Sequence, residues 1–412
     1  MKPDADPEPA ESPAKRRGFV YASYAFLATM FGTTLPTPLY PLYRHEFGLS
    51  QLMITVIYAV YAAGVIGALI FAGRWSDQLG RRRVMFAALG FSAASALVFL
   101  AAGDIALLFL GRVLSGISAG IVTGTATVMI VELAPPKRRA RATLVAAAVN
   151  MGGLGLGPLV AGTLAQYAPL ALRLSFLVDL ALLAFAFLAV IRVPETVQIA
   201  AQPRLGAQRL HVPPEVRAAF IPACIAGFAG FAVMGLFSAV APAFLARILG
   251  LSNLLLAGLT VFTIFATSIL GQLALEWIPR DRALAIGCLI LAAGAGLVGA
   301  GIGAASLALL FAGAAVSGFG QGLSFRAGLA AISARSPADR RAEITSSFFV
   351  VLYVALSLPV IGLGIAAASV GLRIAGVAFA IAVGILALVA LLALWRVRPT
   401  DNTRRRADSE TD

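Results

Sequence analysis

Two ionisable side chains, Arg112 and Asp179, stand well inside long apolar stretches of the sequence. An arginine in an apolar layer costs roughly 2.5–3.5 kcal/mol or more, so it needs a partner or a wet cavity. A cavity arginine could bind an anion or set the pKa of a neighbouring proton carrier. Asp179, the one carboxylate well inside such a stretch, is a candidate proton carrier. The alternatives are that Arg112 extends to a polar surface and that Asp179 faces a neighbouring helix or an outer rim.

The stretches around these residues indicate a membrane protein. Of the residues, 60% are hydrophobic and 12% are charged, against about 25% charged in soluble domains. A helix that crosses a membrane needs about 20 mostly apolar residues. The twelve runs of this kind are 18–40, 50–72, 83–103, 105–130, 141–166, 170–192, 218–244, 252–275, 282–302, 305–333, 344–368 and 371–395. The predicted fold class is an all-α polytopic membrane protein with twelve transmembrane helices.

A polar linker with four prolines divides these runs into two sets of six. The predicted parts are a tail at 1–17, a six-helix bundle at 18–192, the linker at 193–217, a second bundle at 218–396 and a tail at 397–412. Lysine and arginine concentrate in the tails, the linker and alternate loops, which predicts that both termini are cytoplasmic. The net charge of +13 is therefore interpreted as a topology signal, and no nucleic-acid partner is expected.

The sequence offers little for catalysis or metal binding. Its two histidines lie in loops, and its two cysteines, Cys224 and Cys288, lie in apolar stretches, which argues against a disulfide framework or a metal site. A membrane-embedded enzyme would need His, Cys, Asp or Glu gathered within the membrane. We expect no enzymatic activity, no metal and no cofactor.

The sequence repeats itself under a shift of 202 residues. The residues Gly48-Leu49-Ser50, Phe109, Gly111, Ser115, Gly116, Gly120, Pro135, Arg138, Arg139, Ala140 and Thr143 fall on identical residues, from Gly250 to Thr345. Six helices separate the copies, and an even number gives both the same orientation. Parallel halves related by an axis along the membrane normal are a known transporter architecture, with a substrate site at mid-membrane between them.

The loop GRWSDQLGRRR, residues 73–83, lies between the second and third apolar runs. Its pattern of Gly73, Asp77, Gly80 and Arg81, followed by two further arginines, resembles the signature loop of the major facilitator superfamily. Together with the twelve runs, the linker and the repeat, the resemblance covers nearly the whole chain. It implies two six-helix bundles that rock about a central substrate site.

Two further motifs resemble parts of the 12-helix drug:proton antiporter families of this superfamily. Arg112, followed by Gly116, resembles the fourth-helix motif of proton-coupled members. The stretch Gly153–Gly162 resembles the fifth-helix motif found mainly in exporters, here with Gly153, Gly157, Pro158 and Gly162. Small residues permit close helix approach, and a proline bends the helix. These four residues are expected to seal the two halves together on the outer side.

The resemblance also implies a latch in the signature loop. Asp77 is expected to meet Arg81 and the start of the eleventh helix near residues 336–344, and Arg81 is expected to meet Glu132. With the turns at Gly73 and Gly80, this cluster would hold the outward-open state and break on opening inward. The alternative is that the loop only determines topology, which is the interpretation favoured for the two remaining arginines, Arg82 and Arg83.

The superfamily lines its cavity with the first, fourth, seventh and tenth helices. Candidates for coupling or substrate binding are Tyr24, Thr34, Arg112, Asp179, Gln321 and Arg326. Many relatives carry an acid in the first helix and this chain has none, so the proton carrier stays open.

The leading functional hypothesis is a monomeric, proton-coupled exporter of small lipophilic molecules in the cell membrane. Its partners would be the substrate, protons and the lipid bilayer. The alternative is an uptake symporter or facilitator for a sugar or an organic anion. The fifth-helix motif favours export, and the missing first-helix acid weakens the assignment to drug antiport.

Overall fold

The computed structural model describes residues 12–73, 75–203, 206–208, 210–337 and 340–397, with side chains to residue 395. Every regular element in these ranges is helical. The N-terminal half contains α1 (Pro13–Thr34), η1 (Thr37–Leu39), α2 (Tyr40–Phe47), α3 (Gln51–Ala72), α4 (Trp75–Leu79), α5 (Arg81–Leu100), α6 (Ile105–Leu133), η2 (Pro136–Arg138), α7 (Arg139–Tyr167) and α8 (Leu174–Ile191). The C-terminal half contains α9 (Pro214–Ala239), α10 (Ala241–Arg247), α11 (Leu254–Ala274), α12 (Arg280–Gly303), α13 (Leu307–Arg335), α14 (Arg341–Val370) and α15 (Leu372–Val397).

Eleven helices in the described ranges are long and apolar enough to cross a membrane. The remaining predicted span is α1, which is 22 residues long but begins with Lys15, Arg16 and Arg17 and carries several Ser, Thr and Tyr residues. The chain is thus an all-helical, multi-pass protein, and its count of twelve spans stays a prediction.

The first and seventh spans are shorter than their apolar runs predict. Within the run 18–40, α1 ends at Thr34 and η1 follows, with α2 starting at Tyr40, because Pro36 and Pro38 follow the end of α1. The run 218–244 is interrupted at Val240, just before Pro242. Proline has no N–H for the helical ladder, so each break turns the last part of the run into a separate short helix.

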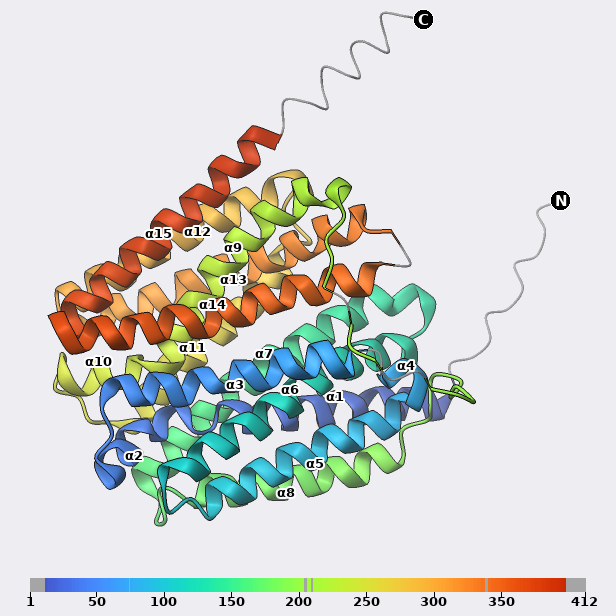
Figure 1. Ribbon diagram of the computed structural model, residues 1–412, viewed down its shortest axis with the longest axis horizontal. Coiled ribbons are helices and arrows are strands. Elements are labelled where there is room, and N and C mark those ends of the chain that lie inside the picture. The colour runs from blue at the N-terminus through green and yellow to red at the C-terminus, as the bar shows by residue number, and fades with distance from the viewer. Residues whose placement is uncertain (1–11, 74, 204–205, 209, 338–339, 398–412) are drawn as a thin grey trace, which may run out of the picture.

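Four long helices begin with the same kind of cap. The side chains of Ser50, Asp104, Asn253 and Ser306 accept hydrogen bonds from the backbone N–H three residues later, at the starts of α3, α6, α11 and α13. Such a cap satisfies one of the N–H groups that a helix start leaves without an intrahelical partner. These four helices start at the end of the bundle opposite the chain termini, here called the distal end; the other end is the terminal end (Figure 1).

The helices form two layers that repeat each other. In Figure 1 the N-terminal half lies below the C-terminal half, and both termini are at the right. The bounds of α6 and α13 coincide under the shift of 202 residues. The same shift relates Gly48 and Gly250, which have φ angles of 61° and 69° and end the short distal segments α2 and α10–Leu249. A positive φ is cheap only for glycine, so the repeat preserves a backbone requirement.

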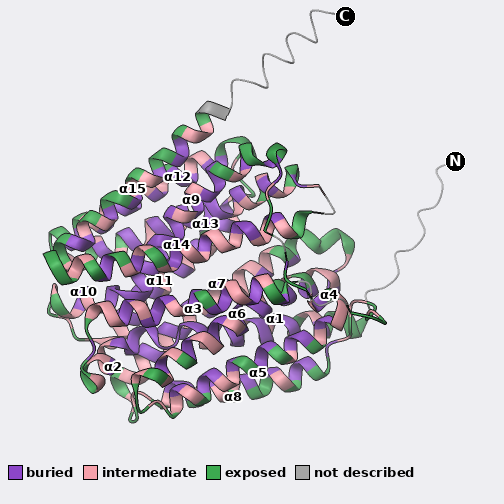
Figure 2. Cartoon of the chain, viewed as in Figure 1, coloured by how far each residue is buried: buried purple, intermediate pink, exposed green. Residues whose placement is uncertain are grey.

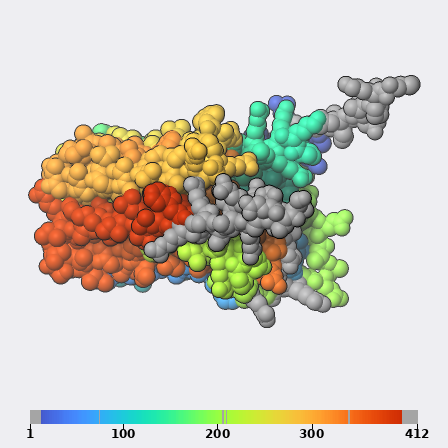
Figure 3. Space-filling view, turned by 90° about the horizontal axis from the view of Figure 1, so that it is seen from above, coloured from blue at the N-terminus to red at the C-terminus, as the bar shows by residue number. Residues whose placement is uncertain are grey.

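The main helix contacts between the halves are those of α3 with α14 and of α7 with α11. The burial pattern fits a bilayer, because buried residues concentrate between the helices and exposed ones on their outer faces (Figure 2). Many of the exposed side chains are large and apolar, such as Phe71, Phe185, Leu270 and Ile381, each more than half exposed. Lipid can solvate such faces as water cannot. The linker and the α6–α7 junction both lie at the terminal end (Figure 3).

Candidate functional site

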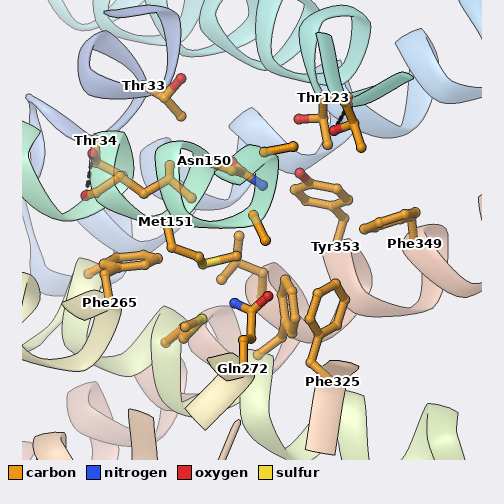
Figure 4. A pocket seen from close by; sticks show the side chains of 18 of the residues that line it. Thr33, Thr34, Thr123, Asn150, Met151, Phe265, Gln272, Phe325, Phe349 and Tyr353 are labelled. Carbon is orange, nitrogen blue, oxygen red and sulfur yellow. Dashed lines mark hydrogen bonds between the residues drawn. The ribbon is translucent and has the colours of Figure 1, made fainter. Parts of the chain in front are cut away.

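A cavity of about 1110 Å³, counting its opening, lies between the two halves. Its lining includes Thr33, Thr34, Tyr58, Tyr61, Arg112, Thr123, Thr127, Thr143, Asn150, Met151, Leu154, Phe231, Met234, Ser238, Phe265, Gln272, Phe325, Arg326, Leu329, Phe349, Tyr353 and Leu356. Both halves contribute, through α1, α3, α6 and α7 on one side and α9, α11, α13 and α14 on the other. Figure 4 shows aromatic rings, the Met151 sulfur and a few hydroxyl and amide groups converging on this space. The wall is therefore mainly apolar, with scattered hydrogen-bonding groups.

The cavity extends towards the terminal end. Thr127 and Leu329 lie in the last two turns of α6 and α13, and Thr143 lies in the first turns of α7, all at that end. The closest contacts between the halves lie at the distal end instead. There Leu254 donates its backbone N–H to Gln166, at 2.8 Å. In this conformation the halves are joined distally.

Arg112 is buried in this cavity, with 1% of its surface exposed. Its Nη1 donates to the backbone carbonyl of Thr33 at 2.8 Å, and its Nη2 donates to that of Tyr58 at 3.3 Å. The guanidinium carbon lies 4.7 Å from the ring centre of Tyr61 and 5.4 Å from that of Tyr58. The side chain is thus directed inwards, and the alternative in which it extends to a polar surface is not what the structure shows.

Asp179 lies apart from the cavity lining, on α8. It is 2% exposed, and its carboxylate packs against Gly32 of α1, where an added Cβ would lie 2.5 Å from one oxygen. Its Oδ1 has no hydrogen-bond partner among the described residues. The interpretation that Asp179 faces a neighbouring helix matches this position.

The remaining site candidates divide into two groups. Thr34 and Arg326 line the cavity, as expected. Tyr24 and Gln321 do not: the Tyr24 hydroxyl donates to the carbonyl of Leu182 at 3.1 Å, and Gln321 accepts a hydrogen bond of 2.7 Å from Ser268. Both therefore pack within a single half. Helix membership alone could not distinguish the cavity face from the opposite face.

Thr34 compensates for a proline in the neighbouring helix. Pro158 lies inside α7 and cannot donate to the carbonyl of Leu154, one turn earlier. The Thr34 hydroxyl donates to that carbonyl instead, at 2.8 Å. A hydrogen bond across the α1–α7 contact thus replaces the missing helical one.

We expect Thr34→Val to destabilise the protein by about 1 kcal/mol, because the Leu154 carbonyl loses its partner. Thr29→Val is the matched control, since Thr29 bonds only to the carbonyl of Ala25 in its own helix. Thermal unfolding of the purified variants measures the difference. Equal melting temperatures for the two variants would contradict the role assigned to Thr34.

The structure brings Asp77, Arg81 and Glu132 together at the terminal end. Arg81 is 5% exposed. Its guanidinium lies 2.5 Å from the Asp77 carboxylate and 3.0 Å from that of Glu132, and it also donates to Ser76 at 2.6 Å. The expected contact of Asp77 with the segment 336–344 stays a prediction, because residues 338–339 of that segment lie outside the described ranges. The Arg81–Glu132 ion pair is intact in this conformation, in which the halves are joined at the distal end and the cavity extends towards the terminal end.

The linker fixes the signature loop from outside. Glu195 accepts hydrogen bonds from the backbone N–H groups of Arg81 and Arg82, at 2.9 and 3.1 Å, and so caps the start of α5. Thr196 donates to Glu132 at 2.5 Å. Gly80 has a φ of 97° and packs against the Glu195 carboxylate, so it needs glycine for both conformation and space.

A second linker segment reaches the other end of the loop. The backbone N–H of Gln208 donates to the carbonyl of Ile70 at 2.7 Å, and the Gln208 side chain accepts a hydrogen bond from Ser346 of α14 at 3.3 Å. Gly73 lies directly against that side chain. The linker thus contacts both halves. Sequence reasoning missed these roles; the Pro194-Glu195-Thr196 triplet was the available signal.

We expect Glu195→Gln to lower stability by about 1 kcal/mol, because an anion at a helix start satisfies N–H groups and the helix dipole. Glu215→Gln is the control. Like Glu195, Glu215 is exposed, but it belongs to the first turn of its own helix, α9. Thermal unfolding at low and high salt checks the prediction, and the Glu195 effect should shrink with salt. An unchanged melting temperature at low salt would refute this capping role.

The four residues of the predicted seal have two different neighbours. Gly153 and Gly157 pack against backbone carbonyls of α1, in their own half. Gly162 packs against Leu254, and the Pro158 backbone against Gly258, both in the other half. Close approach of backbones explains the three glycines among these residues, and Gly258 opposite Pro158. Only the second pair lies between the halves.

A family model described as Major Facilitator Superfamily matches residues 22–300. The chain belongs to the Major Facilitator Superfamily. Members of this superfamily are membrane transporters, so the cavity between the halves is the expected substrate site.

Two curated relatives of the chain are named for drug resistance. The chain is 34% identical to the puromycin resistance protein pur8 of Streptomyces alboniger over 175 residues, 40% of this chain and 35% of that protein. It is 28% identical to the quinolone resistance protein NorA of Staphylococcus aureus (strain Mu50 / ATCC 700699) over 135 residues, 33% of this chain and 35% of that one. The matched stretches thus span about a third of each relative's length.

Solved structures of the superfamily share the fold. The chain superposes on a D-xylose-proton symporter with a TM-score of 0.74 and 17% identity, covering 93% of this chain and 98% of that one. It superposes on the human organic anion transporter MFSD10 (TETRAN) with a TM-score of 0.66 and 20% identity, covering 93% and 100%. At these identities the likeness concerns the fold alone.

Proposed function

We propose that this superfamily member exports small lipophilic molecules from the cytoplasm across the cell membrane by alternating access. The observation that carries the proposal is the mainly apolar cavity between the halves, which extends towards the arginine-rich terminal end. With that end cytoplasmic, as the positive-inside rule indicates, the cavity is accessible to cytoplasmic molecules. The resemblance to resistance proteins supports export.

Proton coupling belongs to the same proposal. Among the described residues, Asp179 is the buried carboxylate. The helix α1 lies between Asp179 and the cavity, since Asp179 contacts Gly32 and Arg112 bonds the next residue, Thr33. A change in the charge of Asp179 would therefore act on the cavity through α1. We also propose that the protein functions as a monomer, because Asp179, α1 and Arg112 all belong to one chain.

We also propose that Asp77 completes a latch when the terminal end closes. The ion pair to Arg81 holds Asp77 in α4, where its side chain is 59% exposed. It is thus free to meet the positive end of the α14 dipole in the opposite conformation. In this form of the latch, Arg81 and Glu132 hold the loop in both conformations and only the contact made by Asp77 breaks.

The alternative is uptake of an organic anion, which the cavity arginines Arg112 and Arg326 favour. Sugar transport has less support, because most of the exposed surface of the cavity wall is apolar, although many of its residues carry a polar group.

Everted membrane vesicles with an imposed pH gradient test the proposal. We expect vesicles containing the protein to accumulate a lipophilic probe, with partial collapse of the gradient, and vesicles without it to do neither. The probes are ethidium, naphthalene-2-sulfonate and naphthalene-2-sulfonamide. Accumulation of the probe in intact cells alone would instead establish uptake and overturn export.

A further inference from the structure

The positive charge of Arg112 has no carboxylate partner within the described residues. Its hydrogen bonds go to two backbone carbonyls, those of Thr33 and Tyr58. No ion pair involves it, and its Nε is buried without a hydrogen-bond partner in the part of the chain that the structure describes. Carbonyl dipoles and tyrosine rings stabilise a cation only in part. A buried cation of this kind is costly until an anion pairs with it.

The fold does not require this arginine. The residue at the same place in the repeated half is Ala314, which is also buried, on α13. Both helices pack within their own halves through the same glycines, of which Gly116 and Gly318 are one pair. An arginine in one copy alone therefore serves something other than helix packing.

The second cavity arginine is in a different state. Arg326 lies nearer the terminal end, donates to the backbone carbonyl of Gln272 and lies 3.9 Å from the Glu276 carboxylate. Its charge already has a partner. Arg112 is thus the unpaired cation at the deep end of the cavity, and no described residue lining this cavity is an aspartate or a glutamate.

The rest of the cavity suits an apolar body. Phe325 contacts the rings of Phe231 and Phe349, with centroids 5.8 and 6.1 Å apart. Figure 4 shows Phe325, Phe349 and Tyr353 on one side of the space and Met151 and Phe265 on the other. Aromatic and thioether side chains adapt to flat apolar groups. A cationic molecule would be repelled by Arg112 and would find no carboxylate among the described lining residues to pair with.

We infer that the molecule transported through this cavity is a lipophilic organic anion, an aromatic or aliphatic body with one carboxylate or sulfonate that binds Arg112. The inference rests on the proposed function, since it takes the cavity as the transport site. The acid group would accept hydrogen bonds from Nε and from the free N–H groups of the guanidinium. A planar guanidinium fits the two oxygens of such a group in a bidentate manner.

Calorimetric titration of the purified full chain in detergent tests the inference without any gradient or transport. Three probes share one ring system: naphthalene-2-sulfonate is anionic, naphthalene-2-sulfonamide is neutral and 2-naphthylmethylammonium is cationic. We expect the sulfonate to bind at least about tenfold more tightly than the other two, as one charge-assisted interaction allows. Inorganic sulfate at the same concentration should not displace it.

Variants assign the preference to Arg112. Arg112→Gln should remove the difference between the sulfonate and the sulfonamide, whereas Arg112→Lys should keep part of it. Arg326→Gln should weaken sulfonate binding less, because Glu276 already pairs with Arg326. Arg83→Gln, an exposed arginine of the signature loop, should change nothing. The ranking of the three probes on the unmodified protein keeps the test valid if Arg112→Gln fails to fold.

Several outcomes overturn the inference: equal or tighter binding of the neutral or cationic probe, no binding of any probe, displacement by sulfate, or an unchanged preference in a folded Arg112→Gln protein. The binding experiment and the vesicle experiment can fail independently, so failure of the anion inference can be told apart from failure of the proposed function. If everted vesicles accumulate ethidium while the sulfonate does not bind, export stands and the anion inference falls. If the sulfonate binds through Arg112 and no vesicle accumulates any probe, export falls.

Discussion

Gly162→Leu is expected to abolish transport while leaving the protein inserted and folded. Gly162 is buried and lies directly against the backbone of Leu254 and close to Gly258 in the other half, with no room for a Cβ. Overpacking of such a contact costs about 1–3 kcal/mol. The cost falls on the distally joined conformation alone, so it would shift the conformational equilibrium roughly 5- to 150-fold.

Gly152→Leu is the matched control, because Gly152 lies in the same helix with open space beside it. Accumulation of naphthalene-2-sulfonate or ethidium in everted vesicles measures transport. The cross-linking yield between Gln166→Cys and Leu254→Cys, residues joined across the distal contact, measures the conformation. Gly162→Leu should lower both readings and Gly152→Leu neither. Normal cross-linking and transport in Gly162→Leu would show that the distal contact tolerates a side chain and would remove its role.

Arg81→Gln is expected to destabilise the protein by about 2 kcal/mol and to lower transport strongly. Removing one partner of a buried ion pair leaves the others uncompensated, at about 3–5 kcal/mol when all are buried. The expected value is smaller because Glu132 and Asp77 are partly exposed. Arg83→Gln should be neutral, since this neighbouring arginine is exposed.

A double-mutant cycle separates the ion pair from the topology signal that both arginines provide. Arg81→Gln and Glu132→Gln are combined, and the free energy of unfolding of the single and double variants is compared. We expect a coupling energy of about 1–3 kcal/mol. Additive effects, or equal losses in Arg81→Gln and Arg83→Gln, would leave the loop as a determinant of orientation only.

Much of the fold follows from hydrophobic patterning. Apolar runs of spanning length became the long helices, and the repeat at 202 residues placed α6 on α13 with the same bounds. The breaks near Pro36 and Pro242 were missed, because apolar composition continues through both prolines while the backbone ladder cannot.

The site was predictable where a residue type is costly in its setting. Arg112 stood out because a charge inside an apolar helix needs a partner or a wet cavity. The Asp77–Arg81–Glu132 cluster was predicted from the resemblance to the signature loop of the superfamily. Tyr24 and Gln321 do not line the cavity as predicted. Each forms a hydrogen bond with a carbonyl or hydroxyl of its own half instead, which a polar residue on a cavity helix can do. Pairing of Glu195 with the α5 start joins residues more than 100 positions apart, which no local pattern encodes.

The central claim is that the two halves must separate at the distal end for transport. A disulfide between Gln166→Cys and Leu254→Cys, in a protein whose native Cys224 and Cys288 are replaced by alanine, tests this most directly. We expect oxidation to stop accumulation of naphthalene-2-sulfonate or ethidium in everted vesicles and reduction to restore it. Full transport by the cross-linked protein would contradict alternating access through this cavity.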